Sequence, residues 1–215
     1  MDVIMSHWGV FGHGLLVSLE LSACTFVLAG AVGLILMVCK VSPVKPLRIG
    51  AQLCVSSIRS VPLLVLLTLF VFGLPEIGLI YSLFWTVVTA MSLYWGAFLC
   101  ETLRSGVRAV PIGQIEAARA LGLTFGQVLW LVVMPQGLRF IIQPLASLMI
   151  AVLLNSSLAA AVGVTQELTG QTQLLDQQYA QPLVSFGAAA TCYVIFTLGI
   201  GRLAALLERR TAVQR

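Results

Sequence analysis

Two long apolar runs of this chain are separated by the sequence QIEAARALG at residues 114–122, which VVMP follows at residues 132–135. The first stretch mixes charged and apolar residues at helical spacing, so it predicts a short amphipathic helix. Gly122 suits the end of that helix, and Pro135 is expected to break or kink the helix that follows. The block either links two spans or, as this degree of organisation favours, docks against another subunit.

The composition identifies the protein class. The chain has 215 residues, of which 59% are hydrophobic and only 9% are charged, and its mean hydropathy is +1.01. Soluble domains carry about a quarter charged residues, so this is an integral membrane protein. The net charge of +4 is spread over short loops, where it sets membrane orientation and does not indicate binding to nucleic acid.

Five apolar segments are long enough to cross about 30 Å of hydrocarbon. We expect transmembrane helices at about residues 17–40, 50–73, 80–100, 138–163 and 182–204. The predicted fold class is an all-α membrane protein, with one transmembrane domain over residues 1–215 and a core at about 15–206. The first segment is too long for a signal peptide, so we expect it to be retained as a helix.

Basic residues gather after the first, third and fifth segments. They are Lys40, Lys45, Arg48, Arg104, Arg108, Arg119, Arg139, Arg202, Arg209, Arg210 and Arg215. The connections after the second and fourth segments contain no base. By the positive-inside rule, the N-terminus lies outside the cell and the C-terminus lies in the cytoplasm. The block at residues 114–122 then lies in the cytoplasm.

Proline, glycine and helix-capping residues predict where the helices of the cytoplasmic block begin and end. Pro111 suits the first turn of a helix, which we expect over residues 112–121. Gly122 suits the left-handed residue after it, and Thr124 with Gln127 fits a capping box that starts the next helix. The predicted arrangement is a helix, a sharp turn and a second helix that leads back to the membrane.

The short helix is predicted to present one face to a partner. Ile115, Ala118 and Leu121 fall near one face at helical spacing. Ala117 and Ala118 are small enough to allow close approach of a partner, and Glu116 can pair with a basic group there.

Several motifs carry a family resemblance. Glu116-Ala117-Ala118, Gly122 and Val132-Val133-Met134-Pro135 resemble the EAA motif of the permease subunits of bacterial ABC importers. The similarity covers about residues 15–209 and is closest to polar amino acid permeases. It includes RSVPLL (59–64), Tyr94 with Glu101 and RSG (104–106), PIGQIEAARALGL (111–123), PQGLR (135–139), SL (157–158) and GVTQEL (163–168).

The resemblance implies an architecture and a set of partners. The fold would be the MetI-like type I ABC importer fold, in a bacterial cytoplasmic membrane. The partners would be two cytoplasmic ATP-binding subunits, a second permease copy or a paralogue, and an extracytoplasmic substrate-binding protein. The residues that would couple to the ATPase are Glu116, Ala117, Ala118, Leu121, Gly122 and Pro135. Residues 40–48 and 101–106 are most similar to glutamate-system permeases, so glutamate is the expected substrate.

The chain itself lacks recognisable catalytic chemistry. Neither lysine, Lys40 nor Lys45, lies in the ATP-binding sequence GxxxxGK[ST]. We find no catalytic triad, no metal-ligand spacing and no useful pair of carboxylates, and we expect the five cysteines to be free thiols. We therefore expect a non-enzymatic subunit that binds no cofactor, with ATP and Mg on the partner ATPase. The alternative is an ATP-independent secondary transporter or channel, against which five spans and few buried acids argue.

Arg59 is the charge within a predicted span that most needs an explanation. It lies about 16 Å along a helix beyond Arg48, and a guanidinium exposed to lipid costs roughly 3 kcal/mol or more. It either faces the substrate pathway, where it could pair with a carboxylate, or forms a structural pair with a carbonyl or with Glu101. Pro62 suggests a broken helix, which is common at transport sites.

Other polar residues leave further alternatives open. Asn155, Ser156 and Ser157 interrupt the fourth span, where they either face the substrate pathway or hydrogen-bond another helix. Glu101 suits a structural role or an inner gate better than a proton relay. The Gln- and Thr-rich segment 165–181 is expected to be an aqueous outer loop, which contacts a binding protein or is a solvated connector.

Overall fold

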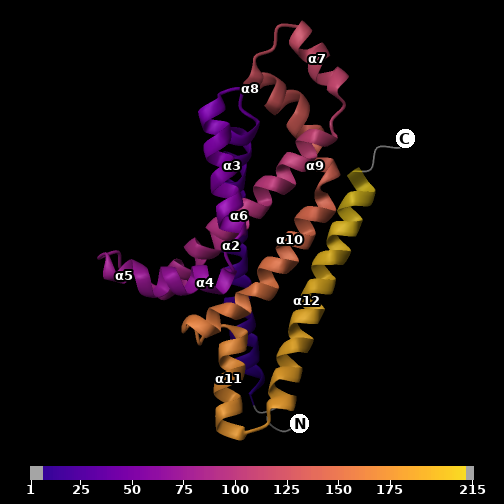
Figure 1. The fold of residues 1–215 in the computed structure, drawn as a ribbon. Coiled ribbons are helices and arrows are strands. Elements are labelled where there is room, and N and C mark those ends of the chain that lie inside the picture. Colours follow the sequence, from indigo (N-terminus) through magenta and orange to yellow (C-terminus); the bar gives the residue numbers. More distant parts are fainter. Residues whose placement is uncertain (1–6, 212–215) are drawn as a thin grey trace.

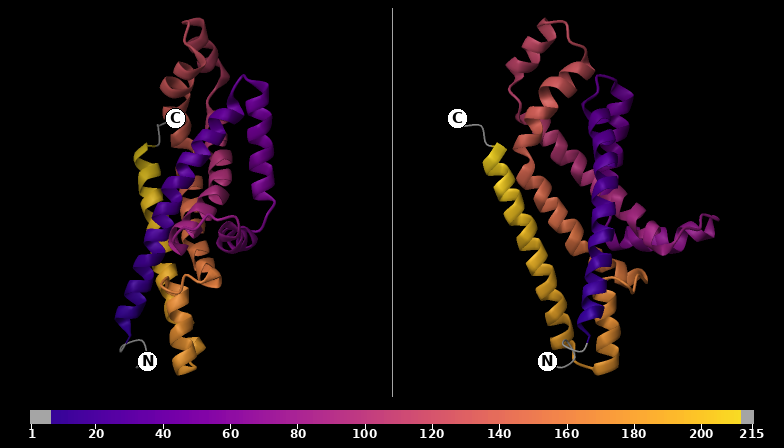
Figure 2. Two further views of the ribbon diagram at one scale, coloured as in Figure 1. Left: turned by 90° about the vertical axis from the view of Figure 1, so that its left-hand side faces the viewer. Right: turned by 180° about the vertical axis from the view of Figure 1, so that it is seen from behind.

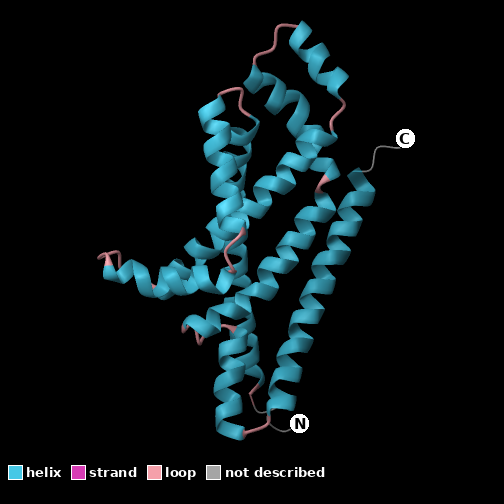
Figure 3. Ribbon diagram, in the orientation of Figure 1, coloured by secondary structure: helices cyan, strands magenta, loops and turns pink. Residues whose placement is uncertain are grey.

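The computed structural model describes residues 7–211, which form helices and connecting turns without a strand (Figure 3). The all-α class predicted from the sequence is confirmed. In chain order, the helices are α2 (Trp8–Val41), α3 (Lys45–Arg59), α4 (Leu63–Thr68), the π-helix η1 (Leu69–Gly73), α5 (Leu74–Glu76), α6 (Leu83–Ala109), α7 (Ile112–Ala120), α8 (Phe125–Gln127), the π-helix η2 (Val128–Val133), α9 (Met134–Phe140), α10 (Ile142–Asn155), the 3-10 helix η3 (Ser156–Val162), α11 (Leu168–Tyr179) and α12 (Pro182–Thr211).

Four helical segments of the described chain are long and apolar enough to cross a membrane: α2, α6, α10 with η3, and α12. The expected span at residues 50–73 is instead two helices, Lys45–Arg59 and Leu63–Glu76, which meet at 100°. Five segments are counted when this bent pair is taken as one broken span.

The break between α3 and α4 follows from proline chemistry. Pro62 is extended (φ −61°, ψ 138°) and caps the start of α4. A proline disfavours helical geometry in the residue before it and lacks an N–H for the helix ladder. The broken helix predicted from Pro62 is therefore present, and Leu63–Glu76 projects sideways from the bundle (Figure 1).

The two ends of the bundle carry different elements (Figures 1 and 2). α7 and α8 lie at one end, and the C-terminal end of α12 points the same way. The start of α2 lies beside α11 at the opposite end. The chain therefore enters and leaves the bundle at opposite ends, as an odd number of crossings requires.

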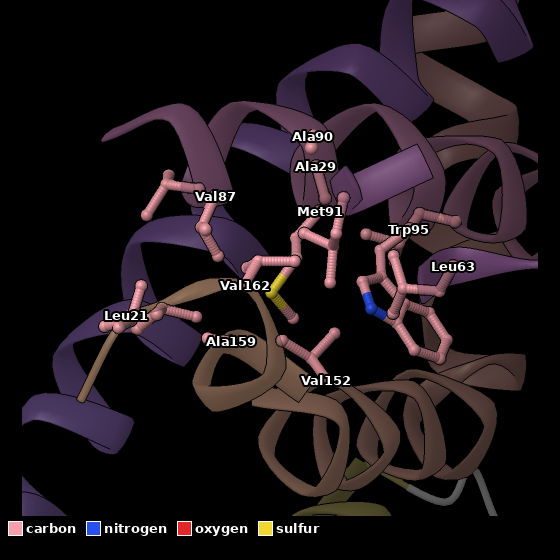
Figure 4. Packing of buried hydrophobic residues seen from close by; sticks show 14 residues of the cluster. Leu21, Ala29, Leu63, Val87, Ala90, Met91, Trp95, Val152, Ala159 and Val162 are labelled. Atoms are coloured by element: carbon pink, nitrogen blue, oxygen red, sulfur yellow. The ribbon is translucent and has the colours of Figure 1, made fainter. Parts of the chain in front are cut away.

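α6 occupies the centre of the packing. Met91 and Trp95 project from α6 toward Val152 of α10, and Leu63 of α4 lies beside the indole (Figure 4). This buried cluster also receives Leu21 from α2. The central helix thus contacts α2, α4 and α10 through one continuous apolar core.

Glycines allow two helices to approach α6 closely. At the α2–α6 contact, a Cβ built on Gly33 would lie 2.9 Å from the carbonyl oxygen of Gly96. At the α6–α9 contact, a Cβ on Gly106 would lie 2.6 Å from the carbonyl oxygen of Gly137, and one on Gly137 would lie 2.8 Å from that of Gly106. Small residues of this kind let backbones pack directly within a membrane.

The helix leading back from α7 is not broken at Pro135, because α8, the π-helix η2 and α9 follow one another without a non-helical residue. Pro135 has no N–H to continue the helical ladder, and the π-helix η2 lies directly before it. The interruption lies at Ile141 (φ −112°, ψ 10°), between α9 and α10.

Residues 165–181 are not the aqueous loop that their composition suggested. Most of the segment forms α11, which packs between α2 and α12. Leu168, Thr172 and Leu175 recur at helical spacing and are buried. Gln173, Gln177 and Gln178 are exposed, so α11 is an amphipathic helix.

Glu167 is fully buried at the start of α11. Its carboxylate accepts backbone hydrogen bonds from Gly170 (2.6 Å) and Thr169 (2.9 Å). It also accepts side-chain bonds from Ser18 of α2 (3.2 Å) and Tyr193 of α12 (3.3 Å). Burial raises the pKa of the Glu167 carboxyl above its usual range. This side chain therefore fastens three helices together and is not a solvated loop residue.

We predict that Gly106→Ala destabilises the protein, because the added Cβ meets backbone that cannot move aside. Overpacking of this kind costs about 1–3 kcal/mol. The midpoint of thermal unfolding in detergent should fall. Gly199→Ala on α12 is the matched control, since no atom lies within 4 Å of its added Cβ. Equal midpoints for both variants would contradict the packing assigned to the α6–α9 contact.

We also predict a pH-dependent contribution from Glu167. A raised carboxyl pKa means that the folded protein binds this proton more tightly than the unfolded chain does. The contribution to stability is therefore fully present below the unfolded pKa of about 4.3 and is lost as the pH rises through the folded value. Thermal unfolding of the wild type and of Glu167→Gln across this pH range measures it, and the variant should show a flatter dependence. Identical profiles would refute the prediction.

Candidate functional site

α7 ends in a turn that fixes its position at the end of the bundle. Gly122 has a left-handed backbone (φ +80°), as its sequence position predicted. The N–H of Gly122 donates to the carbonyl of Arg119 (2.9 Å), and that of Leu123 donates to Ala118 (3.3 Å). These two bonds form a Schellman motif.

The next helix begins immediately after this turn. The backbone N–H of Thr124 donates to the side chain of Gln127 (2.9 Å), and the Gln127 N–H donates to the Thr124 hydroxyl (3.4 Å). The predicted capping box is therefore present. Two well-defined helix ends hold α7 and α8 at a sharp angle without a flexible linker.

The inner face of α7 belongs to the protein's own core. Ala118 is buried and Ile115 is half-buried, in a cluster that includes Val128 and Leu129 of η2. The expectation that Ala118 lets a partner approach closely is therefore wrong for this structure, because η2 already covers that methyl group.

The outer face of α7 is exposed and contains Ile112, Glu116, Ala117 and Leu121, which we call the free face of α7. Ile112 and Leu121 are 73% and 83% exposed. Leu121, the residue that ends α7, is not covered as Ile115 and Ala118 are. The free face offers a carboxylate and an alanine between two large apolar side chains.

α9 connects this region to the central helix. Val133 and Met134 are buried in the same cluster as Ala118, while Pro135 is exposed. The glycine contact between Gly106 and Gly137 then seats α9 directly on α6. A displacement of α7 would therefore be transmitted through packed side chains and backbone.

A partly buried ion pair joins the C-terminal end of α2 to α6. The Lys40 ammonium at the end of α2 is 5% exposed and pairs with the Glu101 carboxylate of α6. Arg104 lies 3.6 Å from the same carboxylate. The sequence assigned Lys40 to a loop, although a lysine and a glutamate that close two apolar runs on the same side could have indicated the pair. This pairing favours a structural or gating role for Glu101.

Arg59 lies at the broken helix and faces aromatic rings. Its guanidinium carbon lies 4.8 Å from the ring centroid of Phe98, a cation–π distance. Arg59 itself is exposed at the end of α3. Among the described residues, the ion-pair partners of Glu101 are Lys40 and Arg104, so Arg59 does not form the structural pair with Glu101 that the sequence left open.

The polar residues of the fourth span bond to their own helix. Asn155 donates to the carbonyl of Ala151 (2.8 Å), and the hydroxyls of Ser156 and Ser157 each donate 2.7 Å bonds to carbonyls three residues earlier. These bonds accompany the change from α10 to the tighter η3. Ser156 is fully buried, which leaves half-buried Asn155 and Ser157 to face a pathway.

The predicted residues form two groups. The coupling residues lie on and after α7, at one end of the molecule (Figure 1). Arg59 and Pro62 lie beside the middle of α6, and the η3 segment that follows Asn155 packs against α4. The candidate pathway is therefore separated from the candidate coupling surface by the α6–α9 contact.

Residues 7–211 contain no group of three His, Cys, Asp or Glu side chains arranged to hold a metal ion. The five cysteines of this part are free. The described side chains thus provide a bent helix at Pro62 and an exposed face on α7.

Comparison with known proteins places this geometry in a family. The family described as "binding-protein-dependent transport system inner membrane component" matches residues 29–213. The probable glutamine ABC transporter permease GlnP of Bacillus subtilis is 33% identical over 207 residues, with 95% of this chain and 94% of that protein covered. The glutamate transport system permease GluC of Corynebacterium glutamicum is 31% identical over 224 residues, with 97% and 98% covered.

A solved structure supports the same assignment. The crystal structure of an amino acid ABC transporter with histidines superposes with a TM-score of 0.89 at 30% identity, and 96% of each chain is covered. The chain therefore belongs to the family of binding-protein-dependent transport system inner membrane components, as a permease subunit with the helical type I ABC importer fold.

Proposed function

We propose that this permease carries a polar amino acid across a bacterial cytoplasmic membrane and that separate ATPase subunits drive it through α7. The observation behind this proposal is the exposure of the free face of α7. It places two strongly exposed apolar side chains, Ile112 and Leu121, around Glu116 at the end of the bundle. Because α7 lies outside the candidate membrane spans, these exposed apolar side chains support a contact with a protein partner and not with lipid. ATP and Mg would be bound by the partner.

The proposed assembly has four kinds of component. Two ATP-binding subunits would each receive one α7, with the C-terminal end of α12 on the same cytoplasmic side. A second permease copy or a paralogue would pack against the projecting segment Leu63–Glu76, where Val65, Leu69 and Phe72 are exposed. An extracytoplasmic substrate-binding protein would approach the opposite end, beside α11.

We propose Arg59 as the group that holds the substrate carboxylate. The guanidinium is exposed at a broken helix and is steadied on the Phe98 ring, and Phe98 lies near the midpoint of α6. Arginine forms two parallel hydrogen bonds with a carboxylate. Asn155 and Ser157 would line the same pathway, and Glu101 would stay in its ion pairs as part of an inner gate.

Glutamate is our first candidate substrate, and glutamine is the second. The identities to the glutamine and glutamate permeases, 33% and 31%, do not separate the two. Both substrates share the α-carboxylate that Arg59 would hold.

We predict that Glu116→Lys and Gly122→Asp uncouple the permease from its ATPase. The first places a cation where the free face has an anion, and the second adds a side chain and a charge at a left-handed turn. Co-purification on a permease tag should recover about ten-fold less ATPase, equivalent to about 1.4 kcal/mol, and uptake should fall with it.

Two controls separate coupling from misfolding. Gly122→Asn tolerates the left-handed backbone without adding charge, and Gln178→Lys adds a lysine at an exposed position of α11. Both should retain ATPase. Unchanged ATPase recovery and uptake in Glu116→Lys and Gly122→Asp would show that α7 is not the coupling element.

We predict that Arg59→Ala lowers uptake about ten-fold or more, which corresponds to loss of one charged contact of about 1.5–3 kcal/mol. Arg59→Lys should retain part of the activity, because it keeps the charge but not the paired hydrogen bonds. Uptake into vesicles that contain the ATPase and the binding protein measures this.

Competition in the same vesicles identifies the substrate. Excess glutamate, glutamine, aspartate or arginine would be added to the labelled amino acid, and glutamate should compete most strongly. Strongest competition by glutamine would move the assignment to the second candidate. If Arg59→Ala leaves transport unchanged, Arg59 does not hold the substrate carboxylate.

A further inference from the structure

Three aromatic side chains cluster near the midpoint of α6. The ring centroid of Tyr94 lies 5.1 Å from that of Phe98, and Trp95 lies 5.4 Å from Tyr94 and 5.5 Å from Phe98. The three rings therefore form one continuous aromatic surface beside the broken helix at Pro62.

The three rings differ in their solvent exposure. Trp95 is 7% exposed and belongs to the core beneath (Figure 4). Tyr94 and Phe98 are half-buried and one helical turn apart, so they present neighbouring rings on one face of α6. The accessible part of the cluster thus consists of two adjacent rings.

One of these two rings already holds a cation. The face of an aromatic ring attracts cations because the ring carries negative charge on its faces, and tyrosine serves at least as well as phenylalanine. The Arg59 guanidinium lies over Phe98 at 4.8 Å. The neighbouring Tyr94 ring is half-buried, so part of it is accessible beside this cation.

Acids are scarce around this cluster. The sequences of α3, α4, α6, α10 and η3 contain one acid between them, Glu101. That carboxylate is already paired with Lys40 and Arg104. A positive group that enters beside Arg59 would therefore be stabilised by a ring rather than by a carboxylate.

We infer that the Tyr94 ring receives the α-ammonium group of the amino acid whose α-carboxylate Arg59 holds. The inference rests on the proposed function, and it assigns the second charge of the same substrate. In an α-amino acid, one carbon atom separates the carboxylate from the ammonium. A carboxylate held by a guanidinium over Phe98 places the ammonium near the next ring, whose centroid is 5.1 Å away.

This arrangement would recognise the α-carboxylate and the α-ammonium, which all α-amino acids share. Arg59 and Tyr94 would recognise the two backbone charges, and the substrate side chain would point away from the rings. Selection among amino acids would then depend on other groups, including the binding protein. Tyr94 is accordingly a residue for the α-amino acid class and not for one side chain.

Direct binding to the permease–ATPase complex in nanodiscs, without the binding protein, tests the inference. The probes are labelled glutamate and 2-hydroxyglutarate, in which a hydroxyl replaces the ammonium. Tyr94→Leu should weaken glutamate binding about 3- to 30-fold, the range of a cation–π contact, and should leave 2-hydroxyglutarate binding within about two-fold of the wild-type value. Tyr94→Phe keeps the ring and should retain glutamate binding. ATPase recovery in each variant verifies folding.

The outcomes separate this inference from the proposed function. Equal weakening of both probes by Tyr94→Leu would assign the ring a packing role and overturn the inference alone. Unchanged glutamate binding in Tyr94→Leu would overturn it as well. If the wild-type complex neither binds nor transports glutamate or glutamine, the proposed substrate falls and the inference falls with it.

Discussion

Direct backbone contact across α6 is the constraint on which the rest of the structure depends. Helices in a membrane gain little from the hydrophobic effect against each other, so close packing must supply their association. Gly33 with Gly96 brings α2 against one side of α6, and Gly106 with Gly137 brings α9 against another. Because these contacts involve backbone atoms, they tolerate no added side chain and fix the relative positions of three helices.

The second constraint on the structure is that a charged group away from water needs a partner. An uncompensated charge away from water is costly, and removing one member of a buried pair leaves the other unpaired. Lys40 and Glu101 meet this requirement by pairing across α2 and α6, beside the glycine contact of the same two helices. Glu167 meets it at the opposite end, where backbone N–H groups and two hydroxyls surround its carboxylate. Each end of α2 is thus tied by one carboxylate to its neighbours.

The sequence predicted features that depend on local chemistry and missed those that depend on distant partners. The helix end at Gly122, the capping box at Thr124 and the break at Pro62 follow from the conformational preferences of a few adjacent residues. By contrast, Ala118 is covered by η2, Lys40 is buried by α6, and residues 165–181 become a helix between α2 and α12. Composition alone could not reveal these outcomes, because each is decided by packing against another element of the fold.

α6 connects the two groups of candidate functional residues. It carries Gly106 at its contact with α9, Glu101 in the ion pair, and Phe98 and Tyr94 at the bent helix. The outermost of these positions, Tyr94 and Gly106, are 12 residues apart, which is about 18 Å along the helix. A shift of α7 that moved α9 would act on α6 through the Gly106–Gly137 contact, where no side chain intervenes to absorb it. The same helix would then displace the aromatic rings relative to Arg59, which belongs to a different element. Because Arg59 ends α3 and the rings belong to α6, a shift of α6 against α3 would change the distance between them.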